Sequence, residues 1–505
     1  MPVFLDIGDD RPDLTLAAPA EEFKLAGLVP AVPADLLAEL RQEFRLSYDS
    51  DRRIEAERNW YVSHPDYLDR VFVRAQRYLP YIRDELERRG LPMELALLPI
   101  VESAYDPFAY SHGRAAGLWQ MIPGTAKRFG VKQNWWYDGR RDIVDSTRAA
   151  LDYLEYLYEL NDGDWLNAIA SYNSGEGNVL RAVRRNKASG KPTDFWHLTV
   201  PKETNSYVPK LLALVDIVRH PAKYDVSLPV VADETQFVVA EIGSQLDLAL
   251  AAELAGVDVD TVYSYNPGYN RWSTDPAGPH TLVVPVNVFE QFSAELANVP
   301  NAERVRWKRH KIGNGETISE IAERFNTTIA SIRTANNLRG NTIRANQHLM
   351  IPVSTKPLAA YSQSADARLK RTQNRQRGGS KVEHSVRHGE SFWTISRRYE
   401  VTTRQLAAWN GMAPGDTLSV GKKLVVWTDA AVVEAAPRTA PTSAHGSTTR
   451  KLNYTVRNGD SLYLIAQKFR VTISQIARWN NIDVKKILRP GQRLTMYVDV
   501  TRQSS

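Results

Sequence analysis

The chain has 505 residues, which is too long for one hydrophobic core, so several domains are expected. Its hydrophobic content of 43% and charged content of 24% are ordinary for globular domains. The absence of cysteine excludes disulfides and cysteine nucleophiles, and with no HExxH motif or glycine-rich phosphate loop we expect neither a metal nor a cofactor.

Charge is distributed unevenly along the chain. Residues 1–60 carry 13 acids against 7 bases, whereas residues 354–505 carry 25 Lys and Arg against 10 Asp and Glu. These bases are dispersed and do not follow one helix face, which favours diffuse attraction to an anionic polymer over nucleic-acid binding. No apolar run is long enough to predict a membrane span, and the acidic residues 1–20 do not resemble a signal peptide.

The N-terminal extension, residues 1–60, is rich in proline at its start. A short helix is predicted from Ala34 to Phe44, because Leu36, Leu37 and Leu40 recur at helical spacing. We expect this helix to dock on the domain that follows.

Residues 61–225 are expected to form an all-α domain. Helical patterns begin at Pro65 and at Tyr81, a longer one runs from Asp145 to Leu160, and Asp164 is placed to cap a helix over residues 165–170.

The most informative stretch is residues 91–130, which predict an apolar helix, a glycine-rich loop and a second helix. Glu102 ends the apolar run, and Asp106-Pro107 discourages further helix. A carboxyl at the end of an apolar helix should have a raised pKa, because burial disfavours its charged form. Glu102 is therefore a candidate general acid.

Residues 226–300 change character. Two β-rich runs, residues 236–240 and 281–286, flank a helical pattern over residues 246–254. This order resembles a degenerate version of the repeat that follows.

That repeat occurs three times, in residues 301–353, 382–427 and 453–500, which we call the first, second and third repeat modules. Each contains a glycine followed by an acid and Thr or Ser, and an asparagine 21 residues after the glycine. Capping patterns predict two short helices between two strands. The segments 354–381 and 428–452 lack apolar periodicity and are expected to be flexible linkers.

Residues 61–225 contain three further blocks. They are Glu102-Ser103 with Ala116-Gly117-Leu118-Trp119-Gln120-Met121, then residues 170–175 around Tyr172-Asn173, then residues 203–208 around Tyr207. In this order they resemble the lytic transglycosylases of the Slt type, whose catalytic domain has a goose-lysozyme-like fold. The repeat modules resemble LysM modules, which bind polymers containing N-acetylglucosamine. The resemblance implies a multidomain protein, with an all-α lysozyme-like catalytic domain followed by small α+β (βααβ) LysM modules on flexible linkers.

The resemblance also implies a set of site residues. Glu102 is the expected catalytic acid, and Tyr207 is expected to orient or bond its carboxyl. The expected substrate-binding residues are Ser103, Ser111, Gly117, Trp119, Gln120, Met121, Tyr172, Asn173 and Tyr207. In the repeat modules, the expected glycan-binding residues are Gly315, Glu316, Thr317, Gly389, Glu390, Ser391, Gly459, Asp460 and Ser461.

The implied reaction is cleavage of the β-1,4 bond between N-acetylmuramic acid and N-acetylglucosamine in peptidoglycan. Glu102 would protonate the bridging oxygen and then take the proton of the muramoyl C6 hydroxyl, leaving a 1,6-anhydro end. This route needs one carboxyl, whereas hydrolytic glycosidases usually need two. Asp106, Asp138, Asp142 and Asp145 match no catalytic aspartate of the family.

Two alternatives stay open: a goose-type muramidase that adds water, and a non-catalytic peptidoglycan-binding scaffold. The resemblance further implies a periplasmic monomer whose partner is peptidoglycan. Its precursor would be associated with the outer membrane, through an export signal and a lipid anchor that are absent from the sequence shown.

Overall fold

A computed structural model describes residues 34–429, 449–456, 473–480 and 491–499, together with the single positions 460, 462, 465, 466, 469, 471 and 482. The chain divides into two compact units, residues 1–430 and 431–505. Within the described residues, no helix is long and apolar enough to cross a membrane.

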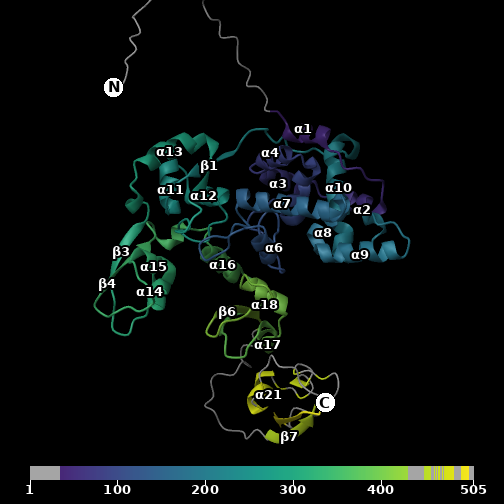
Figure 1. The fold of residues 1–505 in the computed structure, drawn as a ribbon. Helices are drawn as coiled ribbons and strands as arrows, with labels where there is room; N and C mark the ends of the chain where they lie inside the picture. Colours follow the sequence, from purple (N-terminus) through teal and green to yellow (C-terminus); the bar gives the residue numbers. More distant parts are fainter. Residues whose placement is uncertain are drawn as a thin grey trace, which may run out of the picture. The chain divides into compact units, whose positions relative to one another are not determined.

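The predicted all-α domain is present in the first unit (Figure 1). The helices of the N-terminal extension and of this domain are α1 (Leu36–Glu43), α2 (Arg52–Val62), α3 (Pro65–Ala75), α4 (Leu79–Arg89), η1 (Met93–Leu97), α5 (Leu98–Ser103), α6 (Pro123–Arg128), α7 (Ile143–Leu160), α8 (Trp165–Ser174), α9 (Glu176–Ala188), η2 (Phe195–His197), α10 (Lys202–Arg219) and η3 (Pro221–Tyr224). The side chain of Asp164 caps α8, as predicted. The helix α7 begins two residues before its predicted start, because the side chain of Asp142 accepts from two of its backbone amides.

The apolar run before Glu102 is not one helix. Pro99 has no amide hydrogen to donate to the carbonyl of Leu95, so the run divides into the 3-10 turn η1 and the short helix α5. Ala104 ends α5 in a left-handed conformation, with φ of 52°. The two pieces together carry Glu102 to the edge of the core.

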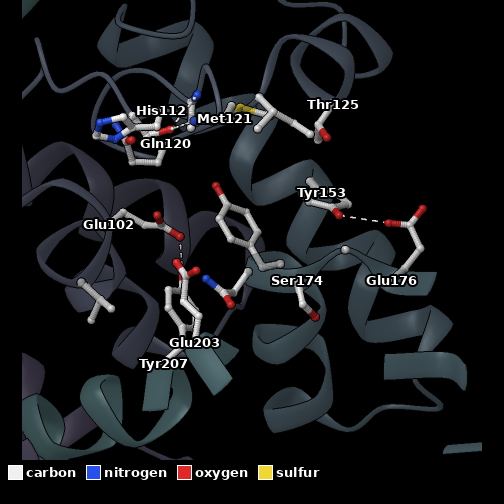
Figure 2. A pocket seen from close by; sticks show the side chains of 18 of the residues that line it. Glu102, His112, Gln120, Met121, Thr125, Tyr153, Ser174, Glu176, Glu203 and Tyr207 are labelled. Atoms are coloured by element: carbon white, nitrogen blue, oxygen red, sulfur yellow. Dashed lines mark hydrogen bonds between the residues drawn. The ribbon is translucent and has the colours of Figure 1, made fainter. Parts of the chain in front are cut away.

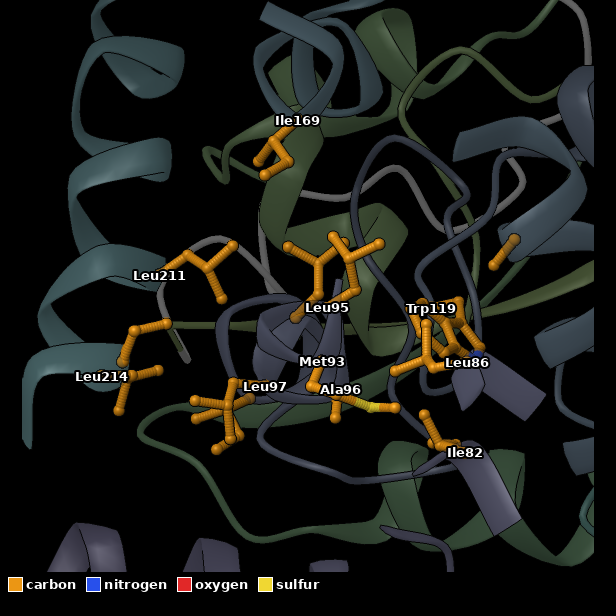
Figure 3. Close-up of a cluster of buried hydrophobic side chains, with 14 of the residues drawn as sticks. Ile82, Leu86, Met93, Leu95, Ala96, Leu97, Trp119, Ile169, Leu211 and Leu214 are labelled. Atoms are coloured by element: carbon orange, nitrogen blue, oxygen red, sulfur yellow. The ribbon is translucent and has the colours of Figure 1, made fainter. Parts of the chain in front are cut away.

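That core surrounds η1 (Figure 3). Leu95 and Leu97 of η1 are fully buried among side chains of α4, α8 and α10, such as Ile169 and Leu211. Buried apolar surface contributes about 25 cal/mol per Å² to stability, so this central turn is among the best-anchored parts of the domain. Glu102 therefore extends from a rigid support.

The predicted docking helix is α1. Leu36, Leu37 and Leu40 are buried in the core of the all-α domain, and Nε of Arg41 donates to the carbonyl of Val218 on α10 at 2.7 Å. The start of the N-terminal extension, residues 1–33, lies outside the described residues.

The next module, residues 226–300, has its own core. Strands β1 (Phe237–Glu241) and β2 (Thr281–Pro285) pair antiparallel, as the two β-rich runs predict. The predicted helix is α11 (Leu248–Ala255). Two further helices, α12 (Val259–Tyr265) and α13 (Phe289–Ala297), were not predicted, although Asp258 provides an N-cap for α12.

The first and second repeat modules have the predicted strand, two helices and strand. The first contains β3 (Arg306–Lys311), α14 (Ile318–Arg324), α15 (Ile329–Ala335) and β4 (His348–Val353), and the second contains β5 (Ser380–Ser385), α17 (Phe392–Arg398), α18 (Thr403–Trp409) and β6 (Lys423–Thr428). Each pair of strands is antiparallel. Predicted capping boxes are present at Thr317 and Thr402.

The repeated asparagine joins helix to sheet. The side chain of Asn410 donates to the carbonyl of Val425 at 2.8 Å and accepts from the amide of the same residue at 2.7 Å. Asn336 forms the same pair of bonds with Met350, and Asn480 with Thr495. A side chain that both donates and accepts is needed here, which explains the asparagine at this spacing.

The second unit is the third repeat module. Its described elements are β7 (Thr449–Thr455), α21 (Ile473–Asn480) and β8 (Arg493–Asp499), and the two strands are antiparallel.

The segment 354–381 is not the unstructured tether that its composition suggested. It contains η6 (Leu358–Ala360) and the helix α16 (Ala365–Asn374), and Ser364 caps this helix. Tyr361 is fully buried in the core of the 226–300 module, where its hydroxyl donates to Asp247 at 2.9 Å. The prediction was wrong because these anchors are isolated residues and form no periodic pattern. Most of the second predicted linker, residues 430–448, lies outside the described residues.

Candidate active site

A cavity of about 660 Å³ lies where α5, α7, α8, α10 and the loop 104–122 meet. It is lined by Val101, Glu102, Ser111, His112, Gly113, Ala115, Gln120, Met121, Ile122, Thr125, Tyr153, Tyr172, Asn173, Ser174, Gly175, Glu176, Glu203, Tyr207, Lys210 and Arg404. The three sequence blocks that lie up to 105 positions apart therefore meet in one cleft (Figure 2).

Glu102 is held in this cleft by Tyr207. The hydroxyl of Tyr207, on α10, donates a short hydrogen bond to Oε1 of Glu102. Burial is the main cause that raises the pKa of Glu102 to about 8, and the negative charge of Glu203 adds to it, while the bond from Tyr207 acts in the opposite direction. A raised pKa favours the protonated form of Glu102 at neutral pH, which is the form that a general acid needs.

Tyr172 and Asn173, on α8, line the same cleft. The hydroxyl of Tyr172 donates to the carbonyl of Trp119 at 2.7 Å, and Oδ1 of Asn173 accepts from Thr204 at 2.8 Å. Burial raises the pKa of Tyr172 and of Tyr207 well above their ordinary range, so both hydroxyls stay protonated and can donate.

The loop 104–122 places Ser111, Gln120 and Met121 on the cleft wall. Gln120 has a left-handed backbone, with φ of 43°, and its Nε2 donates to the carbonyl of Gly117 at 2.8 Å. Oγ of Ser111 accepts from the amide of Ala115 at 3.0 Å. Non-glycine residues adopt such backbone angles at a cost, and they cluster at functional sites.

Three expected substrate-binding residues do not line the cavity. Trp119 is fully buried and its Nε1 donates to Thr147 at 3.0 Å. Ser103 donates to the carbonyl of Leu118 at 2.9 Å, and a side chain on Gly117 would collide with the carbonyl of Arg140. The side chains of Trp119 and Ser103 and the backbone of Gly117 are thus engaged in the loop behind the cleft and not on the cavity wall.

Sequence reasoning missed several cleft residues. Glu176 accepts from Tyr153 at 3.1 Å (Figure 2) and from Arg128 at 3.2 Å. Burial by itself would raise the pKa of Glu176. Hydrogen bonds from its own backbone amide, from Tyr153 and from Arg128 outweigh burial and hold this pKa below its usual value. Glu203 also lines the cleft; its place at the start of the third sequence block was the available signal.

The four aspartates that matched no catalytic residue lie outside the cavity lining. Asp106 accepts from the amide of Phe108, Asp138 pairs with Arg140, Asp142 caps α7, and Asp145 accepts from the hydroxyl of Tyr137. Each has a structural partner.

The acids of the repeat modules are engaged within their own folds. Oε2 of Glu316 lies 2.8 Å from Nε2 of His310, and Oε2 of Glu390 lies 2.8 Å from Nε2 of His384. Asp460 accepts from the hydroxyl of Tyr454. Thr317 and Ser391 cap helices, and Gly315 and Gly389 have left-handed backbones. Gly459 and Ser461 lie outside the described residues.

Comparisons with protein families agree with this organisation. The family described as Transglycosylase SLT domain matches residues 80–195, and the LysM domain family matches residues 310–352, 384–427 and 454–496. The family described as Lytic transglycosylase MltD, LysM-like domain matches residues 236–301.

Two relatives match different shares of this chain. Membrane-bound lytic murein transglycosylase D of Escherichia coli (strain K12) is 35% identical over 410 residues, which cover 77% of this chain and 86% of the relative. Membrane-bound lytic murein transglycosylase C of Glaesserella parasuis is 38% identical over 141 residues, covering 25% of this chain and 38% of the relative. The extent of the first match decides the family: the chain belongs to that of membrane-bound lytic murein transglycosylase D.

Proposed function

We propose that the protein is a peptidoglycan lytic transglycosylase that cleaves the β-1,4 bond between N-acetylmuramic acid and N-acetylglucosamine and leaves a 1,6-anhydro-muramoyl end. The observation that carries this proposal is the state of Glu102, a carboxyl kept protonated by burial and held by Tyr207 at the centre of the cleft. Membership of the transglycosylase family supports it.

In the first step, the proton of Glu102 moves to the oxygen that bridges the two sugars. The bond between this oxygen and C1 of the muramoyl residue breaks, and the N-acetylglucosamine side leaves with a free hydroxyl. Glu102 becomes a carboxylate, and the hydrogen bond from Tyr207 stabilises that charge.

In the second step, the muramoyl C6 hydroxyl attacks C1 and gives its proton to the Glu102 carboxylate. The anhydro ring closes, no water is consumed and Glu102 regains its starting form. One group thus serves as acid and then as base, as microscopic reversibility allows.

Mass spectrometry of soluble fragments released from purified peptidoglycan tests this directly. Fragments that are lighter by one water than reducing muropeptides, and inert to borohydride, are expected. Reducing muramic ends would show hydrolysis, and a folded protein that binds peptidoglycan but releases no fragments would show a scaffold.

Hydrolysis is the second candidate, because Glu203 is a further carboxyl in the same cavity. A hydrolase needs a carboxylate that activates water, so Glu203→Gln would abolish it. The transglycosylase route has no such requirement. For it, Glu203→Gln lowers the pKa of Glu102 and leaves anhydro products as the only kind released.

The remaining cleft residues are proposed substrate contacts: Ser111, Gln120, Met121, Tyr172 and Asn173. We further propose that the glycine–acid–Thr/Ser turns of the repeat modules bind glycan through the backbone, since the acid and the Thr or Ser side chains of the first and second modules are engaged internally. Weak sites on one chain gain through effective concentration on a polymer.

We also propose that the protein acts as a monomer in the periplasm, with its precursor held at the outer membrane by a lipid anchor. The support is the substrate class and the description of its relatives as membrane-bound. Fractionation of cells expressing the full-length gene product, with light scattering of the purified protein, tests both statements.

A further inference from the structure

The second repeat module contributes a side chain to the catalytic cavity. Arg404, in the first turn of α18, lines the cavity together with Glu102, Tyr172 and Lys210, although it lies about 300 positions away from Glu102 in the sequence. Within the part of the chain that the structure describes, no acid forms an ion pair with Arg404 and no hydrogen bond engages its guanidinium.

Several contacts hold this module to the catalytic domain. Arg114, in the loop 104–122, forms a short ion pair with Asp416 of the second repeat module. The guanidinium of Arg368 on α16 stacks over Phe108 of the same loop, with 4.8 Å between Cζ and the ring centroid. The loop 104–122, which lines the cleft, is thus held against α16 and against the second repeat module, which carries Arg404.

The linker helix α16 completes the attachment. At its start, Asp366 pairs with Arg271 of the 226–300 module at 2.5 Å. At its end, Gln373 donates to Asn410 at 3.0 Å and accepts from Nε1 of Trp427 at 3.3 Å, both in the second repeat module. The helix therefore joins two modules by side-chain bonds at both ends and does not act as a free tether.

The repeat itself does not require an arginine at this position. The residue two places after the threonine that precedes the second helix is Ala330 in the first module, Arg404 in the second and Ser474 in the third. The common fold thus forms with a small side chain here. The arginine is particular to the module that meets the cleft.

The charge around the cavity indicates what Arg404 would bind. Two acids of the cavity wall, Glu176 and Glu203, face two bases, Arg404 and Lys210, and Glu176 is already paired with Arg128. Arg404 thus offers a guanidinium that no acid of the described residues engages. A guanidinium offers two parallel donors that match a carboxylate. Peptidoglycan carries carboxylates on its peptide stems, and on the lactyl group of muramic acid where a stem has been removed.

We propose that Arg404 is a specificity residue of the catalytic cleft, which binds a carboxylate of the peptidoglycan strand being cleaved. This inference rests on the proposed function and adds to it that the second repeat module is part of the catalytic unit. It is not only an anchor.

The test compares Arg404→Ala with wild type and with Lys423→Ala in the full chain. Lys423→Ala is a matched control, because this substitution removes one positive charge from the same module. Lys423 lies outside the cleft, in an exposed ion pair with Glu383. Release of anhydro fragments is measured on intact peptidoglycan, on glycan stripped of its stems by an amidase, and on peptidoglycan whose carboxylates have been amidated by carbodiimide.

On intact peptidoglycan we expect Arg404→Ala to lower the rate at limiting substrate about tenfold, with little change at saturation, as for loss of one charged hydrogen-bonded contact. The deficit should disappear on the amidated substrate. If the deficit on intact peptidoglycan vanishes on the stripped glycan, the bound carboxylate belongs to the stem; a deficit on the stripped glycan shows that Arg404 binds the lactyl carboxylate that removal of the stem exposes. Binding to insoluble peptidoglycan should be unchanged, because the variant reproduces the residue of the first module.

A second variant tests the attachment. Asp416→Asn keeps the oxygen that accepts from the amide of Ala413 but removes the charge that faces Arg114. Asp416→Asn should lower the rate of fragment release at limiting substrate. The double variant with Arg404→Ala should be little slower than Arg404→Ala alone, because both substitutions act through the contact of Arg404 with the substrate.

An Arg404→Ala rate equal to that of wild type and Lys423→Ala would overturn the inference while leaving the proposed function intact. An undiminished deficit on the amidated substrate would overturn it as well. If wild type itself releases no fragments, the proposed function fails first.

Discussion

The hydroxyl of Tyr207 on α10 donates a hydrogen bond to Oε1 of Glu102 at the end of α5, across 105 positions of sequence. The bond opposes the effect of burial, which raises the pKa of the same carboxyl to about 8. Tyr207 therefore sets how readily Glu102 loses and regains its proton.

Replacing Glu102 by Gln should lower fragment release by about 10²- to 10⁴-fold, because the amide cannot transfer the proton. Binding to insoluble peptidoglycan should be retained. Both are measured on one preparation, by chromatography of soluble muropeptides and by sedimentation with sacculi. Substantial residual cleavage would show that another residue is the acid.

The same substitution should change how stability depends on pH. The folded state binds more protons than the unfolded state between the ordinary pKa of 4.5 and about 8, so the free energy of unfolding of wild type falls as pH rises through this range. Glu102→Gln removes this dependence, and its melting temperature should rise relative to wild type from pH 5 to pH 8.5. Glu176→Gln is the matched control: the pKa of Glu176 is lowered, so it should show no such gain.

Replacing Tyr207 by Phe should reduce cleavage about tenfold, the effect of losing one hydrogen bond to a charged group. Since that bond lowers the pKa of Glu102, the variant should lose activity at a higher pH than wild type, whose rate should fall as pH rises through about 8. The pH profile of fragment release separates this from a purely structural role. A lower rate with an unshifted profile would contradict it.

Replacing Trp119 by Phe should destabilise the protein by about 1–3 kcal/mol, because the buried hydroxyl of Thr147 loses its donor. The substrate concentration for half-maximal rate should not change, since Trp119 does not line the cavity. Chemical denaturation and kinetics on soluble glycan measure the two effects. Thr147→Val in the Trp119→Phe background should recover part of the stability, and a large loss of affinity would return Trp119 to the substrate surface.

The effect of a C-terminal truncation on binding and on melting temperature should depend on the residue after which the chain ends. Ending the chain after residue 430 removes the third repeat module as a whole compact unit, so peptidoglycan binding should weaken while the melting temperature of the remainder is unchanged. Ending it after residue 353 also removes Tyr361, which exposes the buried Asp247 and should lower the melting temperature. Equal stability of the two truncations would show that α16 does not support the 226–300 module.

The sequence by itself determined the local elements and the chemistry of the motifs. Periodicity and capping residues predicted the helices of residues 61–225 and the strands and helices of the repeat modules, because these depend on neighbours within a few positions. The resemblance identified Glu102, and burial at the end of an apolar run predicted its raised pKa.

Only the tertiary structure decided which side chains share the cleft. Trp119 belongs to a matching motif but faces the core, while Glu176 and Arg404 belong to no predicted site and reach the cavity. The structure of the segment 354–381 likewise depends on isolated partners far away in sequence: Tyr361 bonds to Asp247, and Asp366 of α16 pairs with Arg271. The spacing of residues in the sequence predicts contacts within one helix or strand. Contacts between elements depend on which of their faces pack together, and that is decided only when the whole chain folds.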